Sequence, residues 1–166
     1  MIILGIDPGL ERIGYAVIEK QGSQLRALGY GLIETPRVDL GLRLQQIARE
    51  VKELLAQHDP DAVAIERLFF AKNQTTAMDV AKAVGCIMLS VADAGKECHE
   101  YAPPQVKQSV VGNGSADKRQ VQFMVTRLLG LAAAPKPDDV ADACAIAICH
   151  ALRAGLTGSP SDHPSR

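Results

Sequence analysis

The segment IILGID, residues 2–7, is a short apolar run that ends on an acid and is followed by Pro8-Gly9. A run of this length before turn residues is typical of a buried strand. A similar run, DAVAIE at residues 61–66, also ends on an acid. If the two strands are parallel neighbours, Asp7 and Glu66 lie side by side at the carboxyl edge of a sheet, where α/β proteins bind ligands. The alternative is that each acid caps a turn or pairs with a nearby arginine, Arg12 or Arg67.

The pattern around these two runs predicts the rest of the fold. Alternating residues over 12–19 and 25–34 predict two strands that form an antiparallel meander with 2–7. Residues 98–102 predict a fifth strand, and helical spacing predicts helices over 39–57, 74–94, 104–111, 116–130 and 138–153. This order indicates an α/β fold with a mixed five-stranded sheet, in which parallel strands follow the meander and helices cover both faces. We expect one domain over residues 1–153 and a disordered tail over 154–166.

Composition excludes several classes of protein. The 166 residues are 47% hydrophobic and 22% charged, which is typical of a single globular domain. The chain has no apolar window long enough to span a membrane and no signal-peptide pattern, so we expect a cytoplasmic protein without membrane association. The four cysteines lack CxxC spacing, which excludes a zinc ribbon and argues against a disulfide framework. We expect ordinary buried or half-buried thiols.

The charge distribution is uneven. The net charge is −1, which argues mildly against a nucleic-acid-binding protein. However, residues 103–130 carry four basic residues against one acid, and residues 67–82 carry three against one. An acidic body with a basic face is therefore compatible with the sequence, provided that these two segments meet in the fold.

A third group of acids lies near the end of the chain, in PKPDDVADACAIAICHALRAG at residues 135–155. Asp139 and Asp142 are one helical turn apart at the start of an otherwise apolar helix. Asp138 follows a proline and is a good candidate for the N-cap. Asp142 lies between two alanines and has no lysine or arginine within one turn. A buried acid in this position requires a partner from elsewhere in the fold.

These acids predict a metal site if they converge. Two carboxylates 4 Å apart repel each other by about 4 kcal/mol at an effective dielectric constant near 20, and divalent cations remove this penalty. Ligand sets made only of oxygen select Mg²⁺ or Mn²⁺. Two such ions can activate a water molecule and stabilise the leaving oxygen in phosphodiester hydrolysis.

Three further features are ambiguous from the sequence. The loop at residues 112–118, GNGSADK, offers backbone amides, Ser115 as a helix cap and Lys118, which together suit a phosphate. A plain turn between helices explains the loop equally well, and Lys107 is ambiguous by itself. Phe69-Phe70 follows Glu66 in a polar neighbourhood. The two rings either pack in the core or stack against bases of opened DNA.

Four blocks of sequence resemble the RuvC family of bacterial Holliday-junction resolvases over about residues 1–152. They are GIDPGLERIGYAVIE at 5–19, AIERLFFAKN at 64–73, QVKQSVVGNGSADKRQVQ at 105–122 and DDVADACAIAICH at 138–150. The resemblance implies an RNase H-like fold and a homodimer that resolves four-way junctions by paired, symmetric nicks during recombination and repair. It also implies two Mg²⁺ ions per active site, for which Mn²⁺ substitutes, and partnership with the RuvA–RuvB branch-migration complex.

The resemblance also implies roles for individual residues. The catalytic, metal-binding acids are Asp7, Glu66, Asp139 and Asp142, and the basic active-site residues are Lys107 and Lys118. Phe69 corresponds to the aromatic residue that probes the junction, with Phe70 as a substitute. The DNA-binding residues that we expect are Phe69, Phe70, Arg67, Lys72, Lys107, Lys118 and Arg119. The family pattern D-x-x-D-A favours Asp139 over Asp138, although Asp138 and Asp142 are also one turn apart.

The resemblance leaves some properties open. This chain is less basic than typical members, so we expect its DNA binding to be lost more readily as salt rises. The small-residue face of the helix over 74–94 is the candidate dimer contact. The rival classes are another RNase H-like nuclease acting on structured RNA, an actin-like sugar kinase, and a junction-binding scaffold with vestigial acids. Sugar kinases need two such domains, which 166 residues do not provide.

Overall fold

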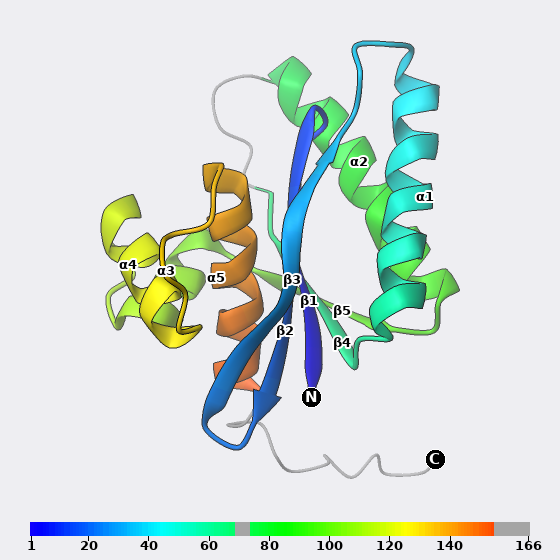
Figure 1. Cartoon of the computed structure of the whole chain (residues 1–166). Coiled ribbons are helices and arrows are strands. Elements are labelled where there is room, and N and C mark those ends of the chain that lie inside the picture. Colours follow the sequence, from blue (N-terminus) through cyan, green and yellow to red (C-terminus); the bar gives the residue numbers. More distant parts are fainter. Residues whose placement is uncertain (69–73, 155–166) are drawn as a thin grey trace, which may run out of the picture.

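The computed structural model describes residues 1–68 and 74–154, and within the second range it describes the side chains from residue 77 onward. Figure 1 shows a central sheet between two layers of helices. The elements are β1(Ile2–Asp7), β2(Arg12–Gln21), β3(Gln24–Glu34), α1(Leu40–His58), β4(Ala62–Glu66), α2(Gln74–Asp93), β5(Glu97–Tyr101), α3(Pro103–Val111), α4(Lys118–Leu128) and α5(Asp138–Arg153). Each begins and ends within two residues of its predicted bounds.

The sheet has the predicted mixed topology. Its strand order is β3-β2-β1-β4-β5, with antiparallel pairs among the first three strands and parallel pairs from β1 to β4 and from β4 to β5. Ile6 of β1 pairs with Ile65 of β4. Because the two strands run in parallel, Asp7 and Glu66 follow these partners and lie side by side at the carboxyl edge of the sheet.

The two faces of the sheet bury two separate cores. On one face α1 and α2 pack against side chains such as Leu4, Ile6 and Val17. On the other face α5 packs against Ile3, Ala16 and Ile18, with α3 and α4 outside it. This arrangement follows from the strand period of two, which sends successive side chains of β1 to opposite faces. The helices therefore cover both faces, as predicted.

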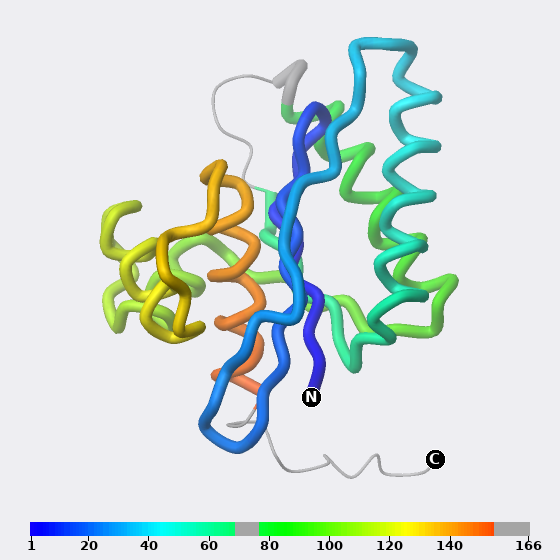
Figure 2. The backbone as a smooth tube through the Cα atoms, viewed as in Figure 1, coloured from blue at the N-terminus to red at the C-terminus, as the bar shows by residue number. Residues whose placement is uncertain are grey.

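Two glycines let α5 lie directly on the central strands, and the backbone trace shows this helix running along the sheet opposite α1 and α2 (Figure 2). A Cβ atom built on Gly5 would overlap the backbone of Ala143 and the side chain of Ala147. A Cβ atom on Gly14 would overlap the carbonyl oxygen of Asp139. The start of α5 is therefore held against β2 beside the end of β1.

Two predicted helix caps are wrong. Ser115 was expected to cap α4, but the N-cap is Asp117, whose side chain accepts a hydrogen bond from the Gln120 amide. Asp138 was expected to cap α5, but Pro137 is the N-cap. The Asp138 carboxylate faces α4 instead, because Lys118 and Gln122 there offer it an ion pair and a hydrogen bond. A cation from a distant element thus outcompetes the local backbone amides.

The cysteines are unpaired thiols, as expected. Cys144 and Cys149 are buried, and Cys86 and Cys98 are half-buried. Burial raises the pKa of Cys144 to about 12 and, together with the charge of Glu100, raises that of Cys98 to about 11. Across the described ranges, no helix is long and apolar enough to cross a membrane. The predicted tail over 154–166 lies, apart from Ala154, outside the described residues.

Candidate active site

The predicted acids come from three elements that meet at one edge of the sheet. Asp7 is the last residue of β1, Glu66 is the last residue of β4, and α5 begins at Asp138. Gly14 of β2 is the antiparallel partner of Asp7 and contacts the backbone of Asp139. The packing of a glycine against the first turn of α5 therefore brings the last group of acids to the two strand ends.

Asp7 is at the centre of this negative group. Its pKa is raised from 3.8 to about 8, first because burial removes water from the carboxylate and then because the charges of Glu66, Asp142 and Asp139 repel it. Burial also raises the pKa of Glu66, and the charge of Asp142 adds to the effect. Carboxylates that resist ionisation together are typical of a site built for a cation.

Lys118 is the distant partner that Asp142 required. From the first residue of α4, its ammonium group lies 3.3 Å from Asp142 and 3.1 Å from Asp138. Burial raises the pKa of Asp142, whereas contact with Lys118 opposes this change. The lysine thus joins the start of α4 to the start of α5.

Asp139 forms an ion pair with an arginine of β2 and not with Lys118. Its carboxylate lies 3.3 Å from the Arg12 guanidinium, which comes from the first residue of β2. One carboxylate oxygen, Oδ2, is buried and accepts no hydrogen bond. Asp138 is different, because its side chain is 60% exposed and its pKa is lowered, chiefly by a hydrogen bond from Lys118. Asp139 is also among the charges that act on Asp7, and these differences favour Asp139 over Asp138 as the site residue.

A hollow of about 200 Å³ opens beside the acids on the α3 and α4 side. Two acids and two lysines line it together with two nonpolar residues: Glu66, Asp142, Lys107, Lys118, Pro103 and Val121. Lys107 comes from α3 and its charge lowers the pKa of Glu66 in opposition to burial. The hollow therefore places two lysines beside two of the four acids, which we call the acidic row: Asp7, Glu66, Asp139 and Asp142. This arrangement suits a phosphate group that lies between the acids and the lysines.

The donor set fits a hard divalent cation. The four acids offer carboxylate oxygens only, which suit Mg²⁺ or Mn²⁺, and Asp139 Oδ2 is buried and accepts no hydrogen bond, although the Arg12 guanidinium lies 3.3 Å from it. Within residues 1–68 and 74–154, no three acidic, histidine or cysteine side chains converge closely enough to hold one ion. The ion pairs explain this arrangement, because Arg12 draws Asp139 to one side and Lys118 draws Asp142 to the other.

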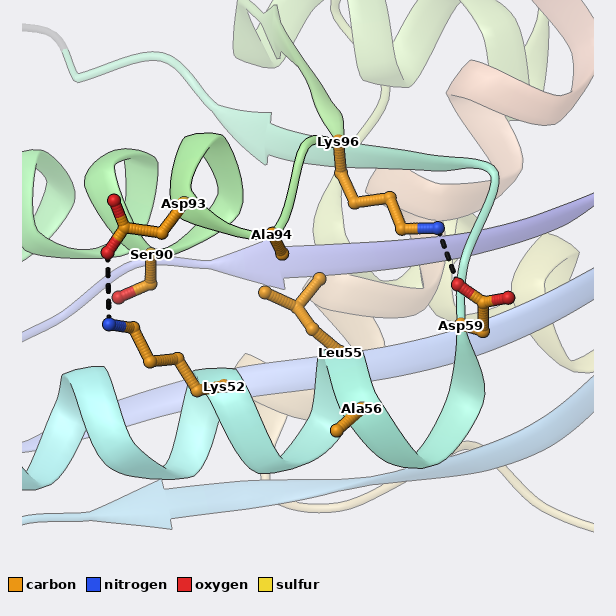
Figure 3. A pocket seen from close by; sticks show the side chains of 8 residues that line it. All are labelled: Lys52, Leu55, Ala56, Asp59, Ser90, Asp93, Ala94 and Lys96. Atoms are coloured by element: carbon orange, nitrogen blue, oxygen red, sulfur yellow. Dashed lines mark hydrogen bonds and ion pairs between the residues drawn. The ribbon is translucent and has the colours of Figure 1, made fainter.

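Another hollow, of about 360 Å³, lies between the ends of α1 and α2 and has no comparable chemistry (Figure 3). Its charged side chains neutralise each other. Lys52 lies 3.0 Å from Asp93, and Lys96 pairs with Asp59. Apolar groups, among them Leu55, complete the lining. Because each charge is already matched, this hollow offers no free group for catalysis.

The structure describes two of the remaining predicted site residues. Arg67 is exposed directly after β4, and Arg119 is exposed on α4. Phe69, Phe70 and Lys72 lie outside the described residues, so their predicted contacts with DNA stay predictions.

The sequence reasoning missed two contributions to the site. The sequence offers Arg12 as a partner of Asp7 or Glu66, yet it pairs with Asp139. Gly14 is not among the predicted site residues, although its position in the alternating run after Asp7 is a usable signal.

A mixed sheet of this order, with acids at the ends of its two central strands and at the start of the helix across them, defines an RNase H-like nuclease. The model of the family described as crossover junction endodeoxyribonuclease RuvC matches residues 3–150. The chain therefore belongs to the RuvC family and is a hydrolytic nuclease. Nucleases of this family generally depend on a metal.

Relatives and solved structures agree with this assignment. The chain is 52% identical to the RuvC endonuclease of Heliobacterium modesticaldum over 159 residues, covering 94% of this chain and 98% of the relative. It is 51% identical to that of Clostridioides difficile, covering 91% and 90%. Thermus thermophilus RuvC in complex with a Holliday junction substrate superposes with a TM-score of 0.90 at 37% identity, covering 94% and 96%. A yeast mitochondrial Holliday junction resolvase shares the fold, with a TM-score of 0.71 at 15% identity and coverage of 93% and 81%.

Proposed function

We propose that this chain resolves four-way DNA junctions by paired, metal-dependent nicks during recombination and repair, with its active site at the Asp7–Glu66 edge of the sheet. The observation that carries the proposal is the acidic row itself. Half-buried carboxylates from β1, β4 and α5 lie at this edge, and two of them, Glu66 and Asp142, line a hollow with Lys107 and Lys118. Burial, and then repulsion from the other three carboxylates, raises the pKa of Asp7 to about 8. The similarity to Thermus thermophilus RuvC, which was solved with a Holliday junction substrate, supports the choice of substrate.

The proposed metal ligands are Asp7, Glu66, Asp139 and Asp142. Two Mg²⁺ ions, or Mn²⁺ ions, bound there would supply charge to activate a water molecule and to stabilise the leaving 3′ oxygen. The four carboxylates would hold this charge in place, and Asp7 would contribute to both sites, since the charges of the other three acids all act on it. Burial of the acids makes the charge more effective, since little water screens it.

The lysines act on the DNA rather than on the metal. Lys107 and Lys118 line the hollow that also contains Glu66 and Asp142. We assign them to hold the scissile phosphate and to neutralise the negative charge that grows on it in the transition state. Lys118 must then exchange its ion pairs with Asp138 and Asp142 for the phosphate. This exchange couples binding of DNA to release of Asp142 toward a metal.

Two symmetric nicks require two active sites, so the proposal includes a homodimer. The predicted contact was the small-residue face of α2, but the structure buries much of that face, including Val84, Ile87 and Val91, in the core of its own chain. The exposed face of α2 carries Met78 and Leu89, whose exposed fractions are 55% and 62%. Large apolar side chains on an exposed helix face suit a contact with a second copy. We therefore propose that the dimer contact lies on this exposed face of α2.

Other parts of the proposal rest on family resemblance. They are a cytoplasmic location, partnership with a RuvA–RuvB branch-migration complex, stacking of Phe69 or Phe70 on junction bases, and phosphate contacts by Arg67, Lys72 and Arg119. We also propose that residues 1–153 form the nuclease domain.

Cleavage of a synthetic four-way junction tests the function. We expect purified protein to nick a mobile junction symmetrically in Mg²⁺ and not in EDTA. Asp7→Asn, Glu66→Gln, Asp139→Asn and Asp142→Asn should each abolish nicking while junction binding remains, because each removes charge and little shape. Asp138→Asn is the matched control and should remain active, since Asp138 is exposed. Loss of activity in Asp138→Asn but not in Asp139→Asn would reverse the assignment.

The same assay separates the rival classes. A structured RNA that is cut in preference to the DNA junction would indicate a different RNase H-like nuclease. Junction binding without any metal-dependent nicking would indicate a scaffold with vestigial acids. Only cutting that requires both the metal and Asp7 agrees with the proposed function.

A further inference from the structure

Arg43 of α1 is a buried cation with an unused donor. Its side chain is 8% exposed, and its Nε atom donates a hydrogen bond to Thr35 Oγ1 at 2.9 Å. Its terminal nitrogen Nη2 is buried and has no hydrogen-bond partner. Arginine stays charged at any physiological pH, so burial without a counter-charge is costly. The unused donor therefore points to a negatively charged group from outside the chain.

This cation lines a hollow of about 490 Å³ on the α1 and α2 side of the acidic row. The lining consists of the turn after β1, the first residue of β2, two residues of α2, and one residue each of α1 and α5: Gly9, Leu10, Glu11, Arg12, Asp79, Val80, Arg43 and Asp139. Asp139 is thus shared between the candidate active site and this second hollow. An anion bound beside Arg43 would lie next to the acids that are proposed to bind metal.

The acids in the lining do not neutralise Arg43, because each already has another basic partner. Glu11 lies 3.3 Å from Arg37, and Asp79 lies 2.9 Å from Lys82. Asp139 lies 3.3 Å from Arg12. Among the charged side chains that line this hollow, only Arg43 has no ion pair with a residue that the structure describes. The hollow therefore has one cationic donor group available for a ligand.

We propose that this hollow is a second phosphate subsite, in which Arg43 binds a backbone phosphate next to the scissile one on the cleaved DNA strand. The inference rests on the proposed function and extends it. A guanidinium group matches a phosphate well, since its planar N–H groups bond two oxygens at once. The acidic row lies between this hollow and the one with Lys107 and Lys118. A strand with one phosphate over the acids therefore reaches a basic group on each side.

Arg12 links this subsite to the acids. It lines the same hollow, and its side chain is 55% exposed although it pairs with Asp139. A phosphate beside Arg43 would attract Arg12 away from Asp139, and the Asp139 carboxylate would then turn toward Asp7. The same DNA strand that brings the scissile phosphate thus prepares one of the proposed metal ligands.

A purely structural role for Arg43 makes a different prediction. Thr35 joins Arg43 to the turn after β1, because its hydroxyl donates to the Leu10 carbonyl oxygen and its amide donates to the Glu11 carbonyl oxygen. If Arg43 only anchors this turn, its loss affects folding and the placement of the acids. Replacing Arg43 would then leave unchanged the number of salt ions that are released when DNA binds.

Salt dependence of junction binding tests the proposal. Wild type, Arg43→Gln, Arg43→Lys and Thr35→Val are titrated onto a fluorescent four-way junction in EDTA over a range of KCl concentrations, with binding read by anisotropy. For Arg43→Gln we expect the slope of log affinity against log salt to fall in magnitude by about one per protomer, as for one lost phosphate contact. Arg43→Lys and Thr35→Val keep the charge and should keep the wild-type slope.

Arg26→Gln is the matched control, because Arg26 is an exposed arginine on β3 that pairs with Glu19. It should leave the slope unchanged. An unchanged slope in folded Arg43→Gln overturns the subsite, and so does a reduced slope in Thr35→Val with the charge still present.

Neutral phosphates provide a test that does not depend on any variant. Junctions with a single methylphosphonate at either position that flanks the scissile phosphate are bound to wild-type protein. We expect one position to weaken binding by roughly tenfold, as expected for a charge-assisted contact of at least 1.4 kcal/mol. The same junction should weaken Arg43→Gln little further. No loss at either position overturns the subsite even if Arg43→Gln fails to fold. If wild type neither binds nor nicks the unmodified junction, the proposed function itself is wrong.

Discussion

Asp7 shows that the proposed active site lowers the stability of the metal-free fold. Its pKa of about 8 lies far above the usual 3.8, so the folded protein binds a proton more tightly than the unfolded chain between these values. The contribution of Asp7 to the free energy of unfolding of the metal-free protein is therefore fully present below pH 3.8 and is lost as pH rises toward 8. We expect Asp7→Asn to remove this loss and to be more stable than wild type by a few kcal/mol at about pH 8.

Urea unfolding in EDTA at about pH 5 and about pH 8 measures the effect. Mg²⁺ should restore much of the lost stability in wild type but little in Asp7→Asn, because it binds only the folded carboxylates. Asp93→Asn, a change at an exposed acid far from the site, is the control and should follow wild type. Equal pH dependence in wild type and Asp7→Asn would contradict the assigned burial of Asp7.

His150 predicts the opposite pH trend at the other end of α5. It is 5% exposed, its Nδ1 lies 2.8 Å from the Tyr101 hydroxyl, and its ring lies 4.6 Å from that of His99. Burial, helped by the charge of His99, lowers the pKa of His150 from 6.5 to about 4. The unfolded chain therefore binds the proton more tightly, and stability is lost as pH falls from 6.5 toward 4.

The loss should reach about 3 kcal/mol at the acid end of this range. We expect His150→Asn to be less stable than wild type at neutral pH, because it loses packing, but to show a smaller decline between these pH values. His58→Asn is the control on another element and should keep the wild-type decline. Thermal or urea unfolding across the range gives the comparison, and an undiminished decline in His150→Asn would refute the assignment.

At the scale of elements, the approach of α5 to β2 decides whether the acids meet. Gly14 is the contact point, because any side chain there would displace the Asp139 carbonyl group. We expect Gly14→Ala to reduce junction cleavage by at least about tenfold and to lower stability by about 1–3 kcal/mol, although every acid and lysine is still present. Gly85→Ala is the control, since a Cβ atom there contacts nothing within 4 Å. Normal cleavage by Gly14→Ala would show that α5 can shift without harm.

The sequence predicted the elements well because their signals are local. The run IILGID, the alternation after Arg12 and the helical spacing from Leu40 each depend on residues close together in the chain. The parallel pairing of β1 with β4 was also accessible, since both runs are fully apolar and each ends on an acid. This pairing alone placed Asp7 beside Glu66.

The contacts between elements were not accessible in the same way. Lys118 and Asp142 are 24 positions apart in the sequence and meet only because α4 packs near the start of α5. The same packing drew Asp138 away from its expected cap. Arg43 carried no signal at all, because it looks like a polar residue in an amphipathic helix. Its burial depends on how α1 lies against the turn after β1.

At the scale of the whole molecule, the active edge and the proposed dimer face belong to different surfaces. The acids lie at one end of the sheet, whereas Met78 and Leu89 are exposed on α2, which covers one face of the sheet. A dimer through α2 would therefore leave both active edges open to DNA. Each copy can then act on one of two opposed strands, and loss of the dimer should separate the two nicks without harming the chemistry.

Leu89→Glu tests this arrangement. Because Leu89 is 62% exposed in the single chain, the change should leave the fold and its stability almost unaltered while it places a charge in the dimer contact. We expect the variant to sediment as a monomer and to nick a junction once, with few paired cuts. Leu42→Glu, at a 58% exposed position on α1, should remain a dimer and cut in pairs. A monomeric variant that still makes paired nicks would show that paired cutting does not require the dimer. A variant that remains a dimer would show that the contact lies elsewhere on the molecule.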